Sequence, residues 1–138
     1  MINKVILIGN LGKDPEVRTL ESGAKVVRFP LATNESYQDK SGEWQTVTEW
    51  HNVTMWRNLA ERAEKDLKKG SLIYLDGKLS TRKWTDKEGQ DRYTTEVVAN
   101  TFRKLDRRDQ LSKGEDDSFN ASNDSITHDD STQDDLPF

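Results

Sequence analysis

The sequence predicts an all-β fold: a small barrel of about five strands that carries one helix and is followed by a non-globular tail. Apolar runs rich in valine, isoleucine and leucine alternate with turns that contain glycine, asparagine and aspartate, which is the pattern of short strands joined by hairpins. Only one segment has helical periodicity, and it falls between the third and fourth strands. These features favour a closed five-stranded barrel of the OB type, with an SH3-like barrel or an open α+β sheet as alternatives.

The strands are predicted from their apolar residues and from the turns that end them, and they cover residues 5–8, 24–33, 46–56, 71–84 and 92–102. Pro30 lies inside the second strand, which suggests an edge or a bulge because proline cannot donate a ladder hydrogen bond. Gly77 is expected to bend the fourth strand. Residues 39–43 form the turn before the third strand, and residues 86–89 form the turn between the last two strands.

The helix is predicted over residues 58–69. Asn58 can cap its N-terminus, and apolar residues recur every fourth position from Leu59 to Leu67, so that one face is apolar. Gly70 is expected to end the helix.

Charge divides the chain into two parts. The 138 residues carry a net charge of −4, but residues 1–105 hold 18 Lys or Arg and 15 Asp or Glu, whereas residues 106–138 hold 3 and 10. The second part is also poor in apolar residues, so it cannot bury enough apolar area to offset its ordering entropy. We therefore predict a barrel domain over residues 1–105, a disordered acidic linker over 106–133 and a separate tip at 134–138.

Several protein classes are disfavoured by what the sequence lacks. It contains no cysteine, so disulfides, thiolate zinc sites and cysteine nucleophiles are excluded. No apolar run approaches the ~18 residues of a membrane span, and the first residues do not read as a signal peptide. We expect a cytoplasmic protein.

The sequence offers little for catalysis. The two histidines are His51, on the core side of a predicted strand, and His128 in the acidic tail. The sequence contains neither a glycine-rich phosphate loop nor a nucleophile elbow. The expectation is a protein that is not an enzyme and needs no cofactor or metal.

Two tryptophans stand out in the strand at 46–56. Side chains alternate between the two faces of a strand, and Val53 and Met55 mark the face toward the core. Trp50 and Trp56 then lie on the opposite, solvent-facing side, about 20 Å apart. Each ring on its own could instead be a core or subunit-interface residue, but two on one polar face indicate a stacking surface.

Further aromatic residues occur beside basic ones. Trp84 stands next to a turn and is flanked by basic residues on both sides, and Tyr37 and Trp44 flank a turn that carries Lys40. Aromatic rings stack on unpaired bases, and nearby cations neutralise phosphates. The pattern predicts a surface for single-stranded nucleic acid, and it does not distinguish DNA from RNA.

The last five residues differ from a simple solubility tail. Two carboxylates, Asp134 and Asp135, precede Leu136, Pro137 and a terminal Phe138. A phenylalanine can fill an apolar pocket of a partner while basic residues of that partner pair with the carboxylates. We expect these residues to form a short protein-docking motif.

Short motifs are distributed over the predicted barrel and the tip. They are NKVILIGNLGKDPEVR at 3–18, LAT at 31–33, TEWH at 48–51, KGS at 69–71, TRKWTD at 81–86, QDRYTTE at 90–96 and DDLPF at 134–138. In these motifs the chain resembles the bacterial single-stranded DNA-binding proteins of the homotetrameric OB-fold type.

This resemblance implies binding of single-stranded DNA without sequence preference in replication, recombination and repair. It also implies a nucleoid-associated homotetramer around which DNA wraps, and a tip that recruits replication, recombination and repair proteins.

The resemblance also implies roles for individual residues. The family's base-stacking positions fall on Tyr37, Trp50, Trp56 and Trp84, and its subunit-contact position falls on His51. The cations expected to contact phosphates are Lys40, Arg57, Lys69, Arg82, Lys83 and Lys87. Trp44 matches no position of the family, so its role is open. An OB domain that binds protein, and one that binds RNA, remain the alternative functions.

Overall fold

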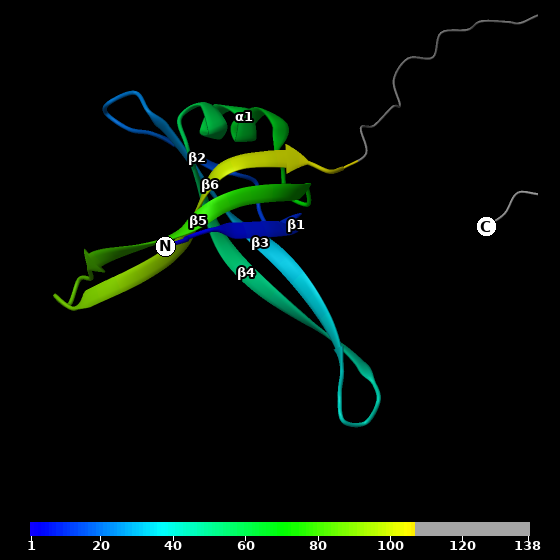
Figure 1. Cartoon of the computed structure of the whole chain (residues 1–138). Coiled ribbons are helices and arrows are strands. Elements are labelled where there is room, and N and C mark those ends of the chain that lie inside the picture. Colours follow the sequence, from blue (N-terminus) through cyan, green and yellow to red (C-terminus); the bar gives the residue numbers. More distant parts are fainter. Residues whose placement is uncertain (107–138) are drawn as a thin grey trace, which may run out of the picture. The chain divides into compact units, whose positions relative to one another are not determined.

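The computed structural model describes residues 1–106. This part of the chain forms six strands and one helix (Figure 1): β1 (Val5–Leu11), β2 (Glu16–Thr19), β3 (Lys25–Gln38), β4 (Trp44–Trp56), α1 (Asn58–Asp66), β5 (Leu72–Thr85) and β6 (Asp91–Lys104). Apart from Asp106, the predicted linker and the whole of the predicted tip lie outside the described residues.

Five of these strands close into a barrel. In residues 1–106 the sheet order is β1-β5-β6-β4-β3-β2, and β3 also pairs with β1 through Leu11 and Leu31, which closes the ring. Strands β4 and β6 are parallel, with Val53 opposite Val97, and the other pairs are antiparallel. The predicted five-stranded OB barrel is therefore confirmed, and the SH3-like barrel and the open sheet are rejected.

The short strand β2 was not predicted. It adds to the edge of β3, with Val17 opposite Val27. Only Val17 of its four residues is partly buried, so the segment is too short and too polar to show an alternating pattern.

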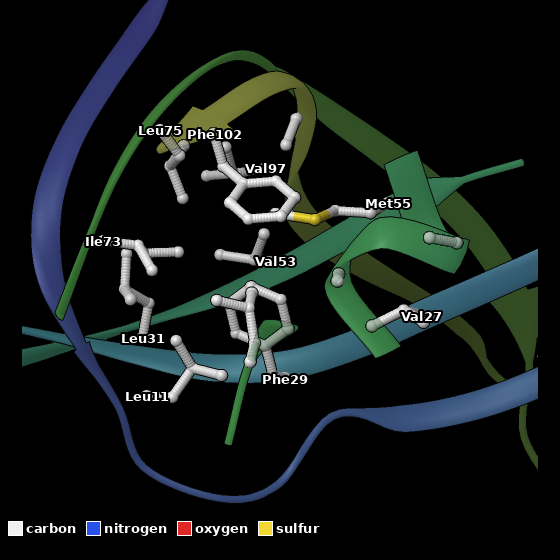
Figure 2. Close-up of a cluster of buried hydrophobic side chains, with 14 residues drawn as sticks. Leu11, Val27, Phe29, Leu31, Val53, Met55, Ile73, Leu75, Val97 and Phe102 are labelled. Carbon is white, nitrogen blue, oxygen red and sulfur yellow. The ribbon is translucent and has the colours of Figure 1, made fainter. Parts of the chain in front are cut away.

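The core fills the barrel and extends beneath the helix. Leu31, Met55, Leu75 and Phe102 are among the buried side chains that meet there (Figure 2). Helix α1 lies over one end of the barrel (Figure 1) and buries Ala60 and Ala63 completely, together with the neighbouring Leu67, which is 6% exposed. Small residues on the buried face let the helix approach the strands closely, and this contact removes apolar area from water.

The helix differs from its prediction at both ends. Arg57, with φ 55°, occupies the N-cap position, and within residues 1–106 no side chain caps this end, so Asn58 is the first helical residue rather than the cap. The helix ends at Asp66 instead of residue 69, because Leu67 adopts an extended conformation and is buried in the core. Gly70, with φ 88°, lies in the following turn.

The strands are longer than predicted. Strand β1 continues through Gly9, where a Cβ atom would collide with the carbonyl oxygen of Ala32, so the glycine permits close packing rather than ending the strand. Strand β3 runs to Gln38 and β4 begins at Trp44, as a two-stranded arm of mostly polar residues that projects from the barrel (Figure 1). The residues of this arm are mostly polar, so the apolar pattern that predicted the strands did not extend to them.

Pro30 and Gly77 have different outcomes. The β3–β4 register is continuous, so the bulge considered for Pro30 is wrong. Pro30 instead lies between the part of β3 that pairs with β2 and the part that pairs with β1, where its missing N–H costs no ladder bond. Gly77 is confirmed as an irregular point, because the β5–β6 register shifts between Asp76 and Gly77.

Candidate nucleic-acid interface

Trp50 stands on the surface where the β3–β4 arm leaves the barrel. Its side chain is 59% exposed, so it is not a core residue of the monomer. The ring lies directly over Gly12, and a Cβ atom at that position would be only 2.8 Å from the ring atom Cη2 of Trp50. Because Gly12 has no side chain, the indole of Trp50 can pack against its backbone, and any larger residue at this position would displace the ring.

Trp56 lies on the same side of β4, six residues further along. It is 41% exposed and stands opposite Val26 in the register. Between the two rings, however, Thr54 is buried at 1% exposure and donates a 2.7 Å hydrogen bond to Glu96 of β6. The prediction that this whole side of β4 faces solvent is therefore wrong, because β6 approaches β4 and covers Thr54.

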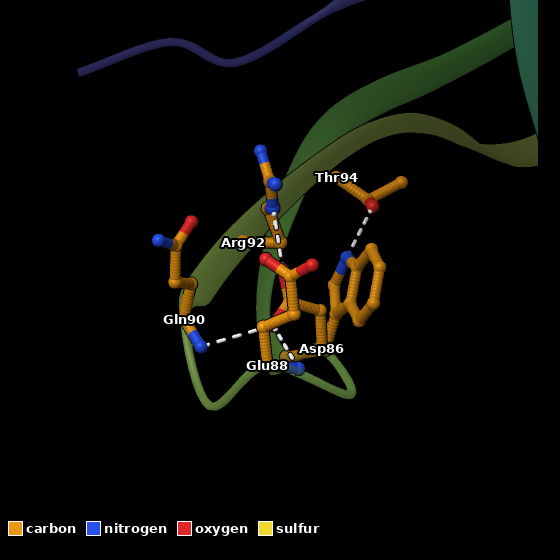
Figure 3. Close-up of polar contacts among 6 residues, drawn as sticks. Asp86, Glu88, Gln90, Arg92 and Thr94 are labelled. Atoms are coloured by element: carbon orange, nitrogen blue, oxygen red, sulfur yellow. Dashed lines mark hydrogen bonds and ion pairs between the residues drawn. The ribbon is translucent and has the colours of Figure 1, made fainter.

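Trp84 is held in one orientation on the β5–β6 hairpin. It is 45% exposed, and its Nε1 donates a 2.8 Å hydrogen bond to Oγ1 of Thr94 (Figure 3). Asp86 closes the adjoining turn by accepting bonds from the backbone N–H groups of Glu88 and Gln90, both at 2.9 Å. The bonds from Gln90 and from the Arg92 guanidinium, at 3.0 Å, contribute most to holding the pKa of the Asp86 carboxyl below its ordinary value.

A groove connects the tryptophan side of β4 with the β5–β6 hairpin. Three cations line it, Lys13, Arg28 and Arg82, together with the carboxylates of Glu16 and Glu96. The Nε atom of Arg28 is buried and has no hydrogen-bond partner among the described residues. An anion entering the groove would meet an unsatisfied donor, which is a favourable position for a phosphate oxygen.

Lys13 and Arg28 were missed by sequence reasoning. Arg28 stands opposite Thr54 in the β3–β4 register, so it shares the side of Trp50 and Trp56. The sequence shows that Arg28 alternates with Val27 and Phe29, but it does not show the pairing of β3 with β4 that places Arg28 beside Trp56. Lys13 lies in a turn between β1 and β2, and its place in the groove depends on the closed barrel.

The predicted phosphate contacts are not gathered in one patch. Arg82 lines the groove, while Lys40 and Lys87 are exposed at the two hairpin turns. Lys83 forms a 3.1 Å ion pair with Asp91, on the side of the hairpin opposite Arg82. The remaining two, Arg57 and Lys69, flank helix α1 and are exposed. Their contacts with phosphates stay predictions.

Tyr37 and His51 lie on the other side of the arm from Trp50. Tyr37 is 47% exposed and stands opposite Gln45. His51 is partly buried opposite Leu31, and its Nε2 lies 2.8 Å from Oγ1 of Thr33. The structure therefore does not bring Tyr37 together with the tryptophan pair, and the subunit contact of His51 stays a prediction.

Within residues 1–106, no group of three or more histidine or acidic residues is placed to hold a metal ion. The helix found there is too short and too polar to cross a membrane.

Together, the fold and this surface define an OB-fold domain with exposed indole rings, a cation-lined groove and two projecting hairpins. The profile of the Single-strand binding protein family matches residues 2–105, and the chain therefore belongs to this family. Its structure is similar to that of the Plasmodium falciparum SSB complex with ssDNA, with a TM-score of 0.71 and 35% sequence identity. The match covers 77% of this chain and 97% of the other.

Proposed function

We propose that this protein binds single-stranded DNA without sequence preference and protects it during replication, recombination and repair. The observation that carries the proposal is the row of exposed indole rings beside a cation-lined groove, with Trp50 seated on Gly12 and Trp56 on the same side of β4. Membership of the single-strand binding family and the similarity to a complex with ssDNA support the same function.

The chemistry of this surface suits a flexible strand. Stacking on an aromatic ring contributes about 1–3 kcal/mol per base and tolerates every base, because each base has a π-face. Cations such as Arg28 and Arg82 neutralise phosphates and carry no sequence information.

The direct test is a titration of the full chain with oligo(dT) at low and high salt. We expect strong quenching of tryptophan fluorescence and an affinity that falls as salt rises, because counterions are released from the DNA. A chain that neither binds nor shows quenching at low salt would falsify the proposal. Competition with poly(U) separates DNA from RNA as the preferred ligand.

We also propose that the protein assembles as a homotetramer in which the exposed face of β1 that carries Ile6 and Ile8 is one of the contacts between subunits. Ile6 and Ile8 are 55% and 56% exposed on neighbouring positions of one side of β1, and their partners in β5 are Asp76 and Tyr74. Large apolar side chains gathered on one face are typical of contacts between subunits. Ile8→Lys should lower the sedimentation mass, and an unaltered mass would count against this interface.

Partner recruitment is assigned to the tip at residues 134–138, from its sequence. Deletion of these residues should leave oligo(dT) affinity intact and abolish capture of replication, recombination or repair proteins. Undiminished capture would contradict the docking role.

A further inference from the structure

Trp44 is the most exposed of the four tryptophans, at 72%. It is the first residue of β4 and stands opposite Gln38, at the end of the arm furthest from the barrel. Leaving such a ring in water forgoes about 2–3 kcal/mol of transfer free energy, and within residues 1–106 its ring nitrogen makes no hydrogen bond to another side chain. Neither the core nor the barrel accounts for the residue.

The strand register places Trp44 in line with the two rings already described. Residues directly opposite in an antiparallel pair share a side, and alternate residues of a strand do so as well. Trp44, Trp50 and Trp56 are spaced six residues apart on β4, and the β3–β4 register continues without a shift from Val26 to Gln38. The three rings therefore follow one side of a twisted ribbon at intervals of about 20 Å.

Charge separates the two sides of the arm. Between Trp44 and Trp50 the tryptophan side carries Thr46 and Thr48, with Ser36 and Asn34 opposite them, and Thr48 donates a 2.8 Å hydrogen bond to Asn34. The carboxylates of the paired arm strands, Glu35 and Glu49, lie on the other side with Tyr37. On the tryptophan side, no carboxylate of the described arm strands would repel a phosphate chain.

We propose that Trp44 is a further base-stacking residue, which extends the DNA track of Trp50 and Trp56 to the end of the β3–β4 arm. The occupant is a base of the same single strand, and Lys40 in the adjoining turn is placed to meet its phosphate. This inference rests on the proposed function and deepens it, because it lengthens the strand contacted by each barrel.

The test compares variants of the full chain in oligo(dT) titrations. Trp44→Ala should weaken binding about 5-fold or more, and Trp44→Phe, which keeps a π-face, should stay closer to the parent protein. Val47→Ala is the matched control, because it removes an exposed apolar side chain from the opposite side of the same strand. The salt slope should not change, since stacking releases no counterions.

A second measurement follows the fluorescence of Trp44 itself. The combined variant Trp50→Phe, Trp56→Phe, Trp84→Phe leaves Trp44 as the only indole in the chain. When a labelled oligo(dT) binds this variant, as followed by anisotropy of the label, the fluorescence of Trp44 should be quenched. Bound oligonucleotide with an unquenched Trp44 overturns the inference.

The remaining outcomes also separate the two proposals. Normal binding by Trp44→Ala, with weaker binding by Trp50→Ala, overturns the inference and leaves the proposed function standing. A lower sedimentation mass for Trp44→Ala assigns the ring to a contact between copies and overturns it as well. Absence of binding by the parent protein overturns both.

Discussion

The two hairpins that project from the barrel close with the same turn but present their aromatic residues differently. Residues 39–43 read Asp-Lys-Ser-Gly-Glu and residues 86–90 read Asp-Lys-Glu-Gly-Gln. In each turn the leading aspartate accepts backbone hydrogen bonds from the second and fourth residues after it, and the glycine has a positive φ, 85° at Gly42 and 78° at Gly89. Both turns therefore depend on local chemistry alone.

Beyond the turns the hairpins diverge. Three side-chain contacts connect residues of the β5–β6 hairpin. Trp84 donates a hydrogen bond to Thr94, and ion pairs join Lys83 to Asp91 and Arg92 to Asp86. In the described β3–β4 arm, the tryptophan that follows the turn, Trp44, has no hydrogen bond to another side chain, and the residue in the position of Trp84 is Tyr37. One hairpin therefore holds its indole with a hydrogen bond, whereas the indole at the end of the other hairpin is 72% exposed and is not held in this way.

The largest expected effect is the loss of the oriented ring. Trp84→Ala should weaken oligo(dT) binding about 5- to 100-fold, because one stacked base contributes about 1–3 kcal/mol. Trp84→Phe should recover most of the affinity in the same titration. If Trp84→Ala instead breaks the assembly and leaves nucleic-acid affinity unchanged, the ring belongs to a protein interface.

A smaller loss of oligo(dT) affinity is expected when Trp84 is kept and only the hydrogen bond that orients its ring is removed. Thr94→Val keeps the shape of the side chain but removes the acceptor of the Trp84 indole bond. The affinity for oligo(dT) should fall about 2-fold, as the net contribution of one exposed hydrogen bond suggests. The polarisation of Trp84 fluorescence, in a variant with the other tryptophans changed to Phe, should also fall. An unchanged polarisation would show that the hairpin packing orients the ring without the bond.

The lysines of the two turns should affect the salt dependence more than the affinity. Lys40→Gln and Lys87→Gln should each reduce the slope of log affinity against log salt by about 0.7, the value for one phosphate of a single strand. Lys65→Gln is the control, since Lys65 is an exposed cation in the last turn of α1 and is not among the predicted phosphate contacts. Slopes that change equally for all three variants would contradict specific phosphate contacts at the turns.

The smallest effect at neutral pH, and the clearest in acid, concerns the two turn aspartates. Hydrogen bonds, chiefly from the Ser41 hydroxyl and the Glu43 N–H, hold the pKa of Asp39 below its ordinary value, as the Gln90 N–H and Arg92 do for Asp86. Because the pKa values are lower in the folded chain than in the unfolded chain, this stabilisation is present above the unfolded pKa of about 3.9 and is lost as pH falls through the folded values.

The double variant Asp39→Asn, Asp86→Asn should therefore show a thermal midpoint that falls less steeply with acid than that of the parent protein. The measurement is a series of circular dichroism melts from about pH 6 down to about pH 2, the range over which carboxyl groups titrate. Parallel curves for the two proteins would show that the turns do not respond to these carboxyls.

The outcome of sequence reasoning differed between local and long-range features. Sequence reasoning predicted the turns at 39–43 and 86–89, an irregular point at Gly77 and the exposure of Trp50 and Trp56, since each depends on neighbouring residues or on alternation within one strand. It did not predict strand β2 or the outer half of the β3–β4 arm. These segments consist mostly of polar residues that are stabilised by pairing with another strand, so they have no apolar pattern.

The sequence by itself determined a five-stranded barrel with one helix, its two hairpin turns and the exposed tryptophans, because hydrophobic alternation and turn chemistry act over a few residues. Only the tertiary structure decided which residues share a surface. Closure of β1 on β3 and the approach of β6 to β4 place Gly12 beneath Trp50 and bury Thr54 opposite Arg28. These contacts join segments that are far apart in the chain, whereas the β3–β4 register is set by the local turn at residues 39–43.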